Sequence, residues 1–254
     1  MKSPHTISVV VPIYNERAAV PRVFEEIDRF LDARFSDYEL IVIESGSTDG
    51  TGEACDALPP LRPRVRVIHE GARNGFGSAV RAGIALATKD WVWPIVVDLP
   101  FELDVIEGAL SQMDTYAAVI SYRSQDPRGG YRRLQSLVFN RLARAVLHVH
   151  AHHINSAFKI VRTPLIQSLG LESRGWLLDA ELIMRLEERG VEYAEIPVRL
   201  VDRTTGRSTI GPAAVVGAIR DLCGLALRRR RLPGGRTAAG REHVDERSSA
   251  VRRP

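Results

Sequence analysis

The chain has 254 residues, of which 44% are hydrophobic and 26% are charged, the ordinary composition of a soluble globular protein. Its net charge of +4 is unevenly placed: residues 228–254 carry nine arginines and three acids, a net of +6, which leaves −2 for residues 1–227. A near-neutral body argues against a nucleic-acid-binding domain, which would carry its own basic face. Cys55 and Cys223 lie far apart without metal spacing, so we expect no disulfide framework and a reducing cytosol.

The N-terminal apolar run is too short for a signal peptide and soon reaches Glu16, and no segment has about 18 uninterrupted apolar residues. The apolar stretch 211–231 is broken by Arg220 and Asp221 and runs into four arginines. We expect an amphipathic helix there, lying either on a membrane surface with its arginines on phosphates or packed on the domain as a final helix. Residues 232–254 have almost no large apolar side chains and are expected to form a disordered basic tail.

Short apolar, β-branched runs alternate with helical patterns along the chain. Strands are expected at residues 7–13, 38–44, 65–69, 91–97, 117–123 and 191–203. Helices are expected at residues 17–32, within 74–88 after a Gly-rich turn, from Tyr131 onward, and at 176–190, where Gly190 fits the position after the helix. This alternation predicts an α/β fold with a mainly parallel sheet covered by helices on both faces. In such sheets ligands bind at the carboxyl ends of the strands.

Polar side chains follow several of these strands, but each signal is weak alone. The ends carry "YNE" at residues 14–16, Glu44 before "SGS", Glu70, and Asp98. The segment "GFG" at residues 75–77 lacks the full spacing of a dinucleotide fingerprint, and "STDGT" at residues 47–51 by itself is typical of a turn and helix cap. The ordered set is more specific than any one of its parts.

The blocks "VVVPIYNE", "IESGSTDGT", "NGFGSAVRAGIALAT" and "VVDLP" resemble the nucleotide-sugar half of glycosyltransferase family 2 enzymes with a GT-A type fold. The later blocks "SYRSQDPRGGYRRLQS", "INSAFK" and "GWLLDAEL", with the "RTTGRS" ending, are similar to dolichyl- or polyprenyl-phosphate sugar synthases. The resemblance covers roughly residues 6–210. It implies a glycosyltransferase domain at residues 1–210, followed by the helix at 211–231 and the tail at 232–254.

The resemblance implies a donor site for a nucleoside-diphosphate sugar. The residues carried over to it are Pro12, Tyr14, Glu16, Glu44, Asp49, Asn74, Gly75 and Gly77. Glu44 would accept hydrogen bonds from base or ribose, and Asp49 would either contact the base or cap a helix. Gly75 and Gly77 would let the backbone approach the ligand, because glycine has no Cβ.

Asp98 matches the last acid of the family's Asp-x-Asp element, which holds a divalent ion on the diphosphate. Val96 stands where the first acid would be, and Pro100 replaces a polar residue. The resemblance therefore implies a weakened Mg²⁺ or Mn²⁺ site with one matching carboxylate, because phosphates and water can complete the shell of such an ion. The alternative is that Asp98 is only a turn residue.

Cations must offset the phosphates of donor and acceptor. Arg123, Arg133 and Arg203 match basic positions of the synthases, with Ser136 and Ser208 as helpers, and the alternative for each arginine is a surface salt bridge. Thr209 stands where a lysine is usual, so one cation is missing. His153 replaces an acid near the acceptor, where it would bind a phosphate or accept a proton, or simply end a helix.

The function implied by the resemblance is that of a cytosol-facing, peripheral membrane glycosyltransferase. It would move a sugar from a nucleoside-diphosphate sugar to polyprenyl phosphate by a single displacement that inverts the anomeric carbon, and it allows for a membrane-protein partner but no nucleic acid. One alternative is a family 2 enzyme with a non-lipid acceptor. Another is a donor-binding pseudoenzyme, toward which Val96, Pro100, His153 and Thr209 all point.

Overall fold

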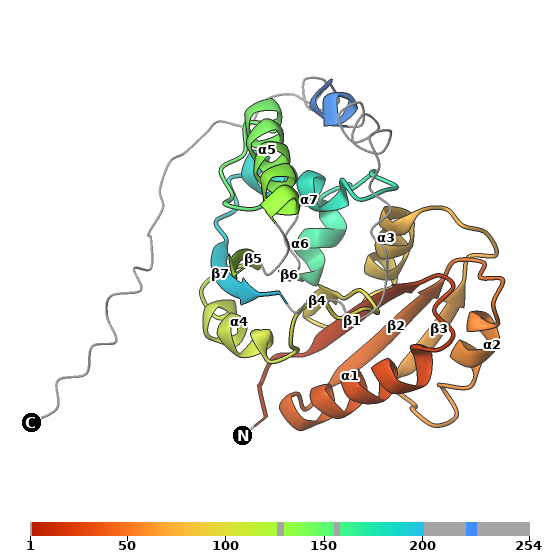
Figure 1. Cartoon of the computed structure of the whole chain (residues 1–254). Coiled ribbons are helices and arrows are strands. Elements are labelled where there is room, and N and C mark those ends of the chain that lie inside the picture. The colour runs from red at the N-terminus through yellow and green to blue at the C-terminus, as the bar shows by residue number, and fades with distance from the viewer. Residues whose placement is uncertain (1, 126–129, 155–157, 201–221, 228–254) are drawn as a thin grey trace, which may run out of the picture.

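The computed structural model describes residues 2–125, 130–154, 158–200 and 222–227. The strands are β1 (Ile7–Ile13), β2 (Tyr38–Glu44), β3 (Val65–His69), β4 (Trp91–Pro94), β5 (Ala118–Gln125), β6 (Lys159–Arg162) and β7 (Ala194–Arg199). The helices are α1 (Val20–Arg34), α2 (Thr51–Asp56), α3 (Phe76–Leu86), α4 (Val105–Met113), α5 (Gly130–Leu147), α6 (Thr163–Ser168) and α7 (Leu178–Glu188). Figure 1 shows their arrangement around one sheet.

The seven strands form a single sheet in the order β3-β2-β1-β4-β6-β5-β7. Only β6 is antiparallel to its neighbours β4 and β5, while the other described pairs are parallel. The predicted mainly parallel α/β sheet is therefore confirmed. The carboxyl ends of six strands and the beginning of β6 consequently share one border of the sheet, which we call the carboxyl edge: Ile13, Glu44, His69, Pro94, Lys159, Gln125 and Arg199.

Alternate residues of the central strands point to opposite layers of core. Val9 and Val11 of β1 are fully buried in one layer, which also holds the apolar faces of α1 and α4. Val10 is buried in the other layer against α3 and α7. Gly83 of α3 allows this contact, because a Cβ there would stand 2.3 Å from Val10 Cγ1. Burial on both faces explains why these strands are continuous apolar runs.

The structure corrects the predicted elements in two respects. The strand predicted at residues 91–97 ends at Pro94, and the chain then turns, with Leu99 N bonded to the Val96 carbonyl at 3.1 Å and a positive φ of 37° at Leu99. The short elements α2, α4, β6 and α6 were not predicted as elements. Each spans nine residues or fewer, too few for a clear periodicity.

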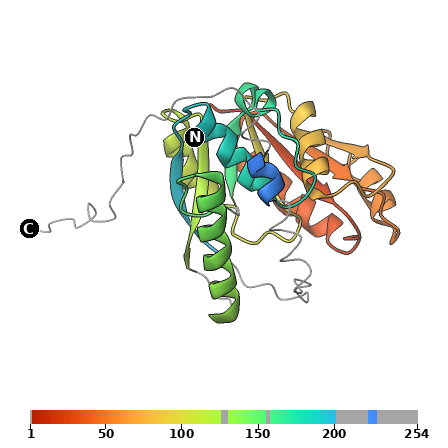
Figure 2. The ribbon, with the colours of Figure 1, turned by 90° about the horizontal axis from the view of Figure 1, so that it is seen from above.

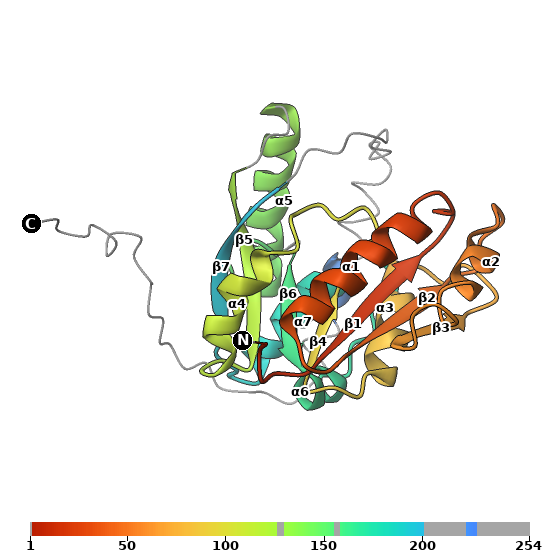
Figure 3. The same cartoon turned by 90° about the horizontal axis from the view of Figure 1, so that it is seen from below.

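A third apolar cluster joins α5, α7 and a late helical segment. Leu222 and Leu225 are buried there with Ala143, Leu147 and Ile183. The described part of the late segment, residues 222–227, thus packs on the domain, while the rest of the predicted helix at 211–231 and the tail at 232–254 lie outside the described residues. Among the described helices, none is both long and apolar enough to cross a bilayer. Figures 2 and 3 show α5 projecting beyond the sheet.

Candidate active site at the carboxyl edge

Strand direction gathers the predicted site residues on one border of the sheet. Tyr14 and Glu44 lie at the ends of β1 and β2, and Asp98 follows β4. Arg123 lies near the end of β5, and His153 lies shortly before β6, which begins at the same edge. Arg133 lies in α5, but its side chain is outside the described part, and Arg203 lies outside the described residues altogether.

Hydrogen bonds join the loop after β1 to the loop after β2. Ser47 Oγ accepts from Asn15 N at 3.0 Å, and Asn15 Oδ1 accepts from Thr48 N at 2.9 Å. Asn15 has a positive φ of 53°, a conformation that Asn tolerates better than most residues. Glu16 N donates to Thr51 Oγ1 at 2.9 Å. These bonds hold the two loops of the predicted nucleoside region as one unit.

Asp49 lies within this loop pair and has the contacts of a turn residue. Its Oδ1 accepts from Thr51 N at 3.0 Å, and its Oδ2 accepts from Arg17 N at 3.3 Å. The Thr51 hydroxyl bond comes first among the interactions that lower the pKa of Asp49. Asp49 therefore stabilises the turn before α2 but does not cap that helix, whose N-cap is Gly50 without a side-chain cap bond, and its side chain lies exposed at the edge.

Pro12 lies on β1, and Tyr14 lies just past the end of that strand. The Arg73 guanidinium stands 4.4 Å from the centroid of the Tyr14 ring, so the loop before Asn74 reaches across to the end of β1. Pro12 lies beyond the last residue of β1 that pairs with β4, which is Val10, so its missing N–H breaks no ladder on that side. Tyr14 is only half-buried, which leaves part of the ring open at the edge.

Glu44 is buried at 4% exposure and organises the loop that follows it. Its Oε1 accepts from Ser47 N at 2.6 Å, and its Oε2 lies 3.0 Å from His69 Nδ1. Burial raises the pKa of Glu44, but hydrogen bonds from Ser47, His69 and Gly46 together hold the pKa below its usual value. Glu44 is therefore an ionised carboxylate already engaged by protein donors.

His69 connects Glu44 to α2. Its Nε2 lies 2.9 Å from Asp56 Oδ1, and the bonds to Asp56 and Glu44 raise the pKa of His69. His69 was not among the predicted site residues, although the parallel register sets it directly beside Glu44. The residues that follow Glu44 and His69 are also joined, since Ser45 Oγ donates to Glu70 Oε2 at 2.8 Å.

Gly75 and Gly77 are packed against a loop of the protein. A Cβ on Gly75 would stand 2.5 Å from the Arg174 carbonyl oxygen, and one on Gly77 would stand 2.5 Å from that of Ser173. Gly75 also has a φ of 99°, which L side chains rarely adopt. Packing within the protein therefore explains why both positions are glycine, apart from any close approach of the backbone to a ligand.

The Glu181 side chain binds the backbone of the loop at residues 172–176. This fully buried carboxylate accepts from Glu172 N and, at 2.7 Å, from Ser173 N. Trp176 at the end of the loop is 68% exposed and stacks on Phe76 with ring centroids 4.5 Å apart. Phe76 begins α3, so this aromatic pair stands where the Gly-rich turn enters the helix.

Asp98 lies exposed in the turn that closes between Val96 and Leu99. Among the described residues, no group of three His, Cys, Asp or Glu side chains is arranged to hold a metal ion. An exposed carboxylate is a suitable oxygen ligand for Mg²⁺ or Mn²⁺, but the ion would need most of its shell from donor phosphates and water. The residues present thus fit a metal that arrives with the donor.

Arg123 is tied to α5 through a chain of polar contacts. Its Nη1 donates to Ser136 Oγ at 2.8 Å, and Asn140 Nδ2 donates to the Ser136 carbonyl at 2.8 Å. Asn140 Oδ1 in turn accepts from Ile154 N at 2.8 Å. The half-buried His153 immediately precedes Ile154, so α5 fixes both the end of β5 and the segment that carries His153. These hydrogen bonds of Asn140 to Ser136 and Ile154 were not predicted from the sequence.

The neighbouring histidines are paired with separate carboxylates. His150 Nδ1 lies 2.9 Å from Glu187 Oε2, and His152 Nδ1 forms a short contact with Glu195. These partners lie on α7 and β7, so the histidines diverge as their alternation along the chain suggests. Close by, Lys159 at the start of β6 pairs with Asp179 of α7, both nearly buried.

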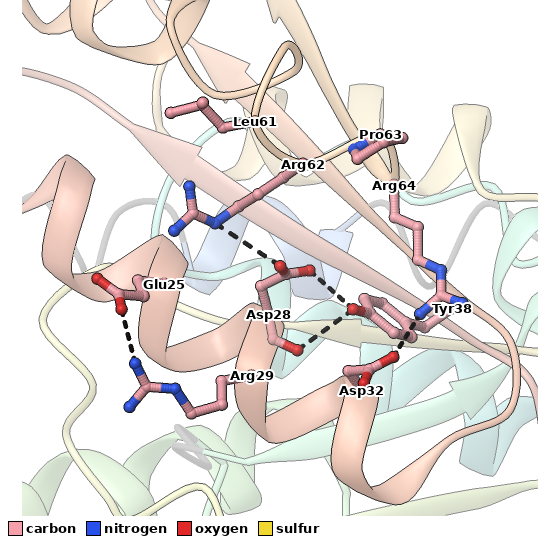
Figure 4. A pocket seen from close by; sticks show the side chains of 9 residues that line it. All are labelled: Glu25, Asp28, Arg29, Asp32, Tyr38, Leu61, Arg62, Pro63 and Arg64. Atoms are coloured by element: carbon pink, nitrogen blue, oxygen red, sulfur yellow. Dashed lines mark hydrogen bonds and ion pairs between the residues drawn. The ribbon is translucent and has the colours of Figure 1, made fainter.

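A surface depression of about 470 Å³ lies at the opposite end of the sheet. It is lined by α1, by Tyr38 at the start of β2 and by residues 61–64 before β3 (Figure 4). Its charges are compensated locally: Arg64 pairs with Asp32 at 2.9 Å, and Tyr38 Oη donates to Asp28 at 2.8 Å. It is therefore not a continuation of the carboxyl edge.

Comparisons with known proteins agree on the family. Residues 8–170 match the model of glycosyl transferase family 2. Polyprenol monophosphomannose synthase of Mycolicibacterium smegmatis is 26% identical over 219 residues, 79% of each chain. Glycosyltransferase AglD of Haloferax volcanii is 28% identical over 204 residues, which are 76% of this chain but only 32% of that longer protein.

Solved structures share the fold. Glucosyl-3-phosphoglycerate synthase from Mycobacterium tuberculosis, in complex with Mn²⁺, uridine diphosphate and phosphoglyceric acid, superposes with a TM-score of 0.67 at 24% identity, over 91% of this chain and 80% of that chain. The predicted resemblance is confirmed. The chain belongs to glycosyl transferase family 2 and is a glycosyltransferase with a GT-A type fold.

Proposed function

We propose that this enzyme transfers a sugar from a nucleoside-diphosphate sugar to the phosphate of a polyprenyl phosphate. The observation that carries the proposal is the convergence of the joined loops at Asn15 and Ser47, the Asp98 turn and Arg123 on one edge of the sheet. A diphosphate donor needs a nucleoside site, a metal ligand and a cation near the leaving group, and this edge offers one candidate for each.

Within this proposal the nucleoside lies over the joined loops, beside the Tyr14–Arg73 pair. Glu44 acts as a positioning residue, because its oxygens already hold Ser47 and His69. Asp98 would be the residue that holds a Mg²⁺ or Mn²⁺ ion together with the donor diphosphate, and such an ion would neutralise charge on the leaving nucleoside diphosphate. The Mn²⁺ and uridine diphosphate of the mycobacterial synthase structure support a divalent ion here.

On the acceptor side, Arg123 binds phosphate oxygens, with Arg133 and Arg203 as further cations and His153 beside them. A phosphate monoester is already anionic and needs less activation by a base than a sugar hydroxyl does. One of its oxygens attacks the anomeric carbon as the bond to the donor diphosphate breaks, so configuration inverts and the nucleoside diphosphate leaves. The similarity to polyprenol monophosphomannose synthase supports a lipid-linked acceptor.

The test is a panel of radiolabelled nucleoside-diphosphate sugars incubated with the full chain, Mg²⁺ or Mn²⁺ and polyprenyl phosphate. The proposal predicts label in the organic phase with at least one donor. Label transferred to 3-phosphoglycerate but not to lipid would contradict the lipid acceptor and favour the non-lipid alternative, the acceptor class that the mycobacterial neighbour carries. Donor binding without transfer to any acceptor would contradict catalysis and favour the pseudoenzyme.

A further inference from the structure

Helix α5 has an inner face that packs on the protein and an outer face that is exposed. On the inner face Ala143 and Leu147 are fully buried. On the outer face Leu137 is 59% exposed, Val138 57% and Leu142 36%, and they lie within two turns of one another. Large apolar side chains gathered on an exposed face mark an interaction surface more often than scattered single ones do.

The charge of α5 has one sign only. Its eighteen residues include four arginines and no aspartate or glutamate. Arg141 is exposed between Val138 and Leu142 and so shares the outer face. An exposed apolar stripe that includes an arginine, on a helix without a carboxylate, is typical of a helix that lies in the plane of an anionic lipid surface.

We propose that the outer face of α5, formed by Leu137, Val138, Arg141 and Leu142, docks the enzyme on an anionic bilayer surface. The apolar side chains enter the boundary between headgroups and acyl chains, and Arg141 binds lipid phosphates. This inference deepens the proposed function, on which it rests for its purpose. It assigns docking to α5, in addition to any role of residues 211–231.

The inner face of the same helix reaches the candidate active site. Ser136 accepts from Arg123, and Asn140 accepts from Ile154 N beside His153. The diameter of a helix with its side chains is about 10–12 Å, so a bilayer against the outer face lies about one helix from the Arg123 guanidinium. A polyprenyl phosphate could then present its phosphate to Arg123 while its chain remains in the bilayer.

A second copy of the chain fits this face less well than lipid does. In a two-fold dimer the same patch meets itself, so the exposed Arg141 of one copy would face the same patch of the other, and α5 carries no acid to compensate the charge. Opposed like charges are destabilising. The described late segment does not supply a cover either, because Leu222 and Leu225 pack in the cluster with the inner-face residues Ala143 and Leu147.

The direct test places an environment-sensitive fluorophore on the full-length chain. In a C223S background, Val138→Cys is labelled on α5, and Leu61→Cys serves as a matched control, because Leu61 is 75% exposed far from the carboxyl edge. Vesicles of phosphatidylcholine with phosphatidylglycerol should shift the emission at position 138 to the blue and leave position 61 unchanged. No shift at 138, or an equal shift at 61, would overturn the inference.

A functional test uses the triple variant L137S/V138S/L142S beside L61S. We expect the triple variant to lose about tenfold in affinity for the anionic vesicles and in transfer to long-chain polyprenyl phosphate embedded in them. Transfer to a short, water-soluble polyprenyl phosphate should stay within about twofold, since the inner face is untouched. L61S should behave as the unmodified chain does in both assays.

The outcomes separate this inference from the proposed function. Unchanged vesicle affinity in the triple variant overturns the docking role of α5, and so does loss of a dimer at unchanged vesicle affinity, which would make the face a contact between copies. Vesicle docking that depends on α5, without transfer to any polyprenyl phosphate, supports the docking surface and contradicts the proposed function instead.

Discussion

The Arg123 guanidinium donates to the Ser136 hydroxyl at 2.8 Å and so joins the end of β5 to the inner face of α5. The two residues are 13 apart in the sequence, and the bond forms where α5 begins shortly after the end of β5. It holds a cation at the border where the parallel strands end. A permanently charged group in a fixed position is what a phosphate acceptor and a diphosphate leaving group require.

Arg123→Gln should therefore impair transfer much more than folding. We expect a loss of about a hundredfold in kcat/KM for the phosphate acceptor, because one preorganised positive donor is removed. Arg189→Gln is a matched control, since Arg189 also donates to a serine hydroxyl, that of Ser168, at 2.7 Å, but beyond α7. Steady-state kinetics should leave R189Q near the unmodified enzyme; equal losses in both variants would contradict the role of Arg123.

Two buried carboxylates at opposite ends of β2 allow a second comparison. Glu44 holds the loop at the carboxyl edge, whereas Glu39 accepts from Ser8 Oγ at 2.7 Å and from Thr88 N at 2.7 Å at the other end. Glu44→Gln should weaken donor binding about tenfold by loosening this loop. Glu39→Gln should lower the free energy of unfolding by about 1–3 kcal/mol and leave donor affinity unchanged.

Titration calorimetry with the donor and urea unfolding distinguish these effects. Equal weakening of donor binding in E39Q and E44Q would contradict a specific role of Glu44 in holding the donor site at the carboxyl edge.

The pKa of His69 makes stability depend on pH in a definite direction. Asp56 first and then Glu44 raise this pKa above its usual value, so the folded state favours the charged ring. The resulting stabilisation is fully present below about pH 6.5 and is lost as the pH rises through the folded pKa. His69 is 41% exposed, so the screened pairs contribute about 1 kcal/mol or less.

His69→Gln should thus destabilise the protein more at about pH 6 than at about pH 9. Urea unfolding of both proteins at each pH measures the difference. A larger effect at the higher pH would show that the neutral ring is the favoured form.

Gly77→Ala tests the packing of the Gly-rich turn. The new methyl group would stand 2.5 Å and 2.7 Å from two backbone carbonyl oxygens, those of Ser173 and Gly175, so the backbone must move. We expect the free energy of unfolding to fall by about 1–3 kcal/mol, as overpacking usually costs. Gly175→Ala in the same loop meets no atom within 4 Å and should change stability by less than about 0.5 kcal/mol.

Calorimetric or urea unfolding of the two variants side by side gives the answer. Equal stability of G77A and the unmodified chain would mean that the loop at residues 172–176 adapts freely.

The fold was predictable because its strands are buried on both faces. Runs such as β1 and β2 are mostly apolar and β-branched, so their type and direction follow from composition and from the helices between them. The short β6 and α6 gave no such signal, and the antiparallel direction of β6 depends on pairing with β4 and β5. Family 2 membership was likewise readable, since it depends on the order of several motifs.

The candidate site was predictable as a set of strand ends but not as a set of contacts. Glu44 is visible in the sequence, whereas its partner His69 follows only from the register of β2 and β3. The glycines at 75 and 77 look like ligand contacts until the loop at 172–176, distant in sequence, is seen against them. The apolar stripe on α5 also does not reveal which of its members face outward.

Asp98 is the residue on which the catalytic account depends most. The most direct measurement compares Mg²⁺- or Mn²⁺-dependent formation of labelled lipid by D98N with that by E102Q, a substitution of an exposed acid four residues later. We expect D98N to lose at least about a hundredfold in rate and E102Q to stay within about twofold of the unmodified enzyme. Unchanged, metal-dependent transfer by D98N would contradict the account and leave Asp98 as a turn residue only.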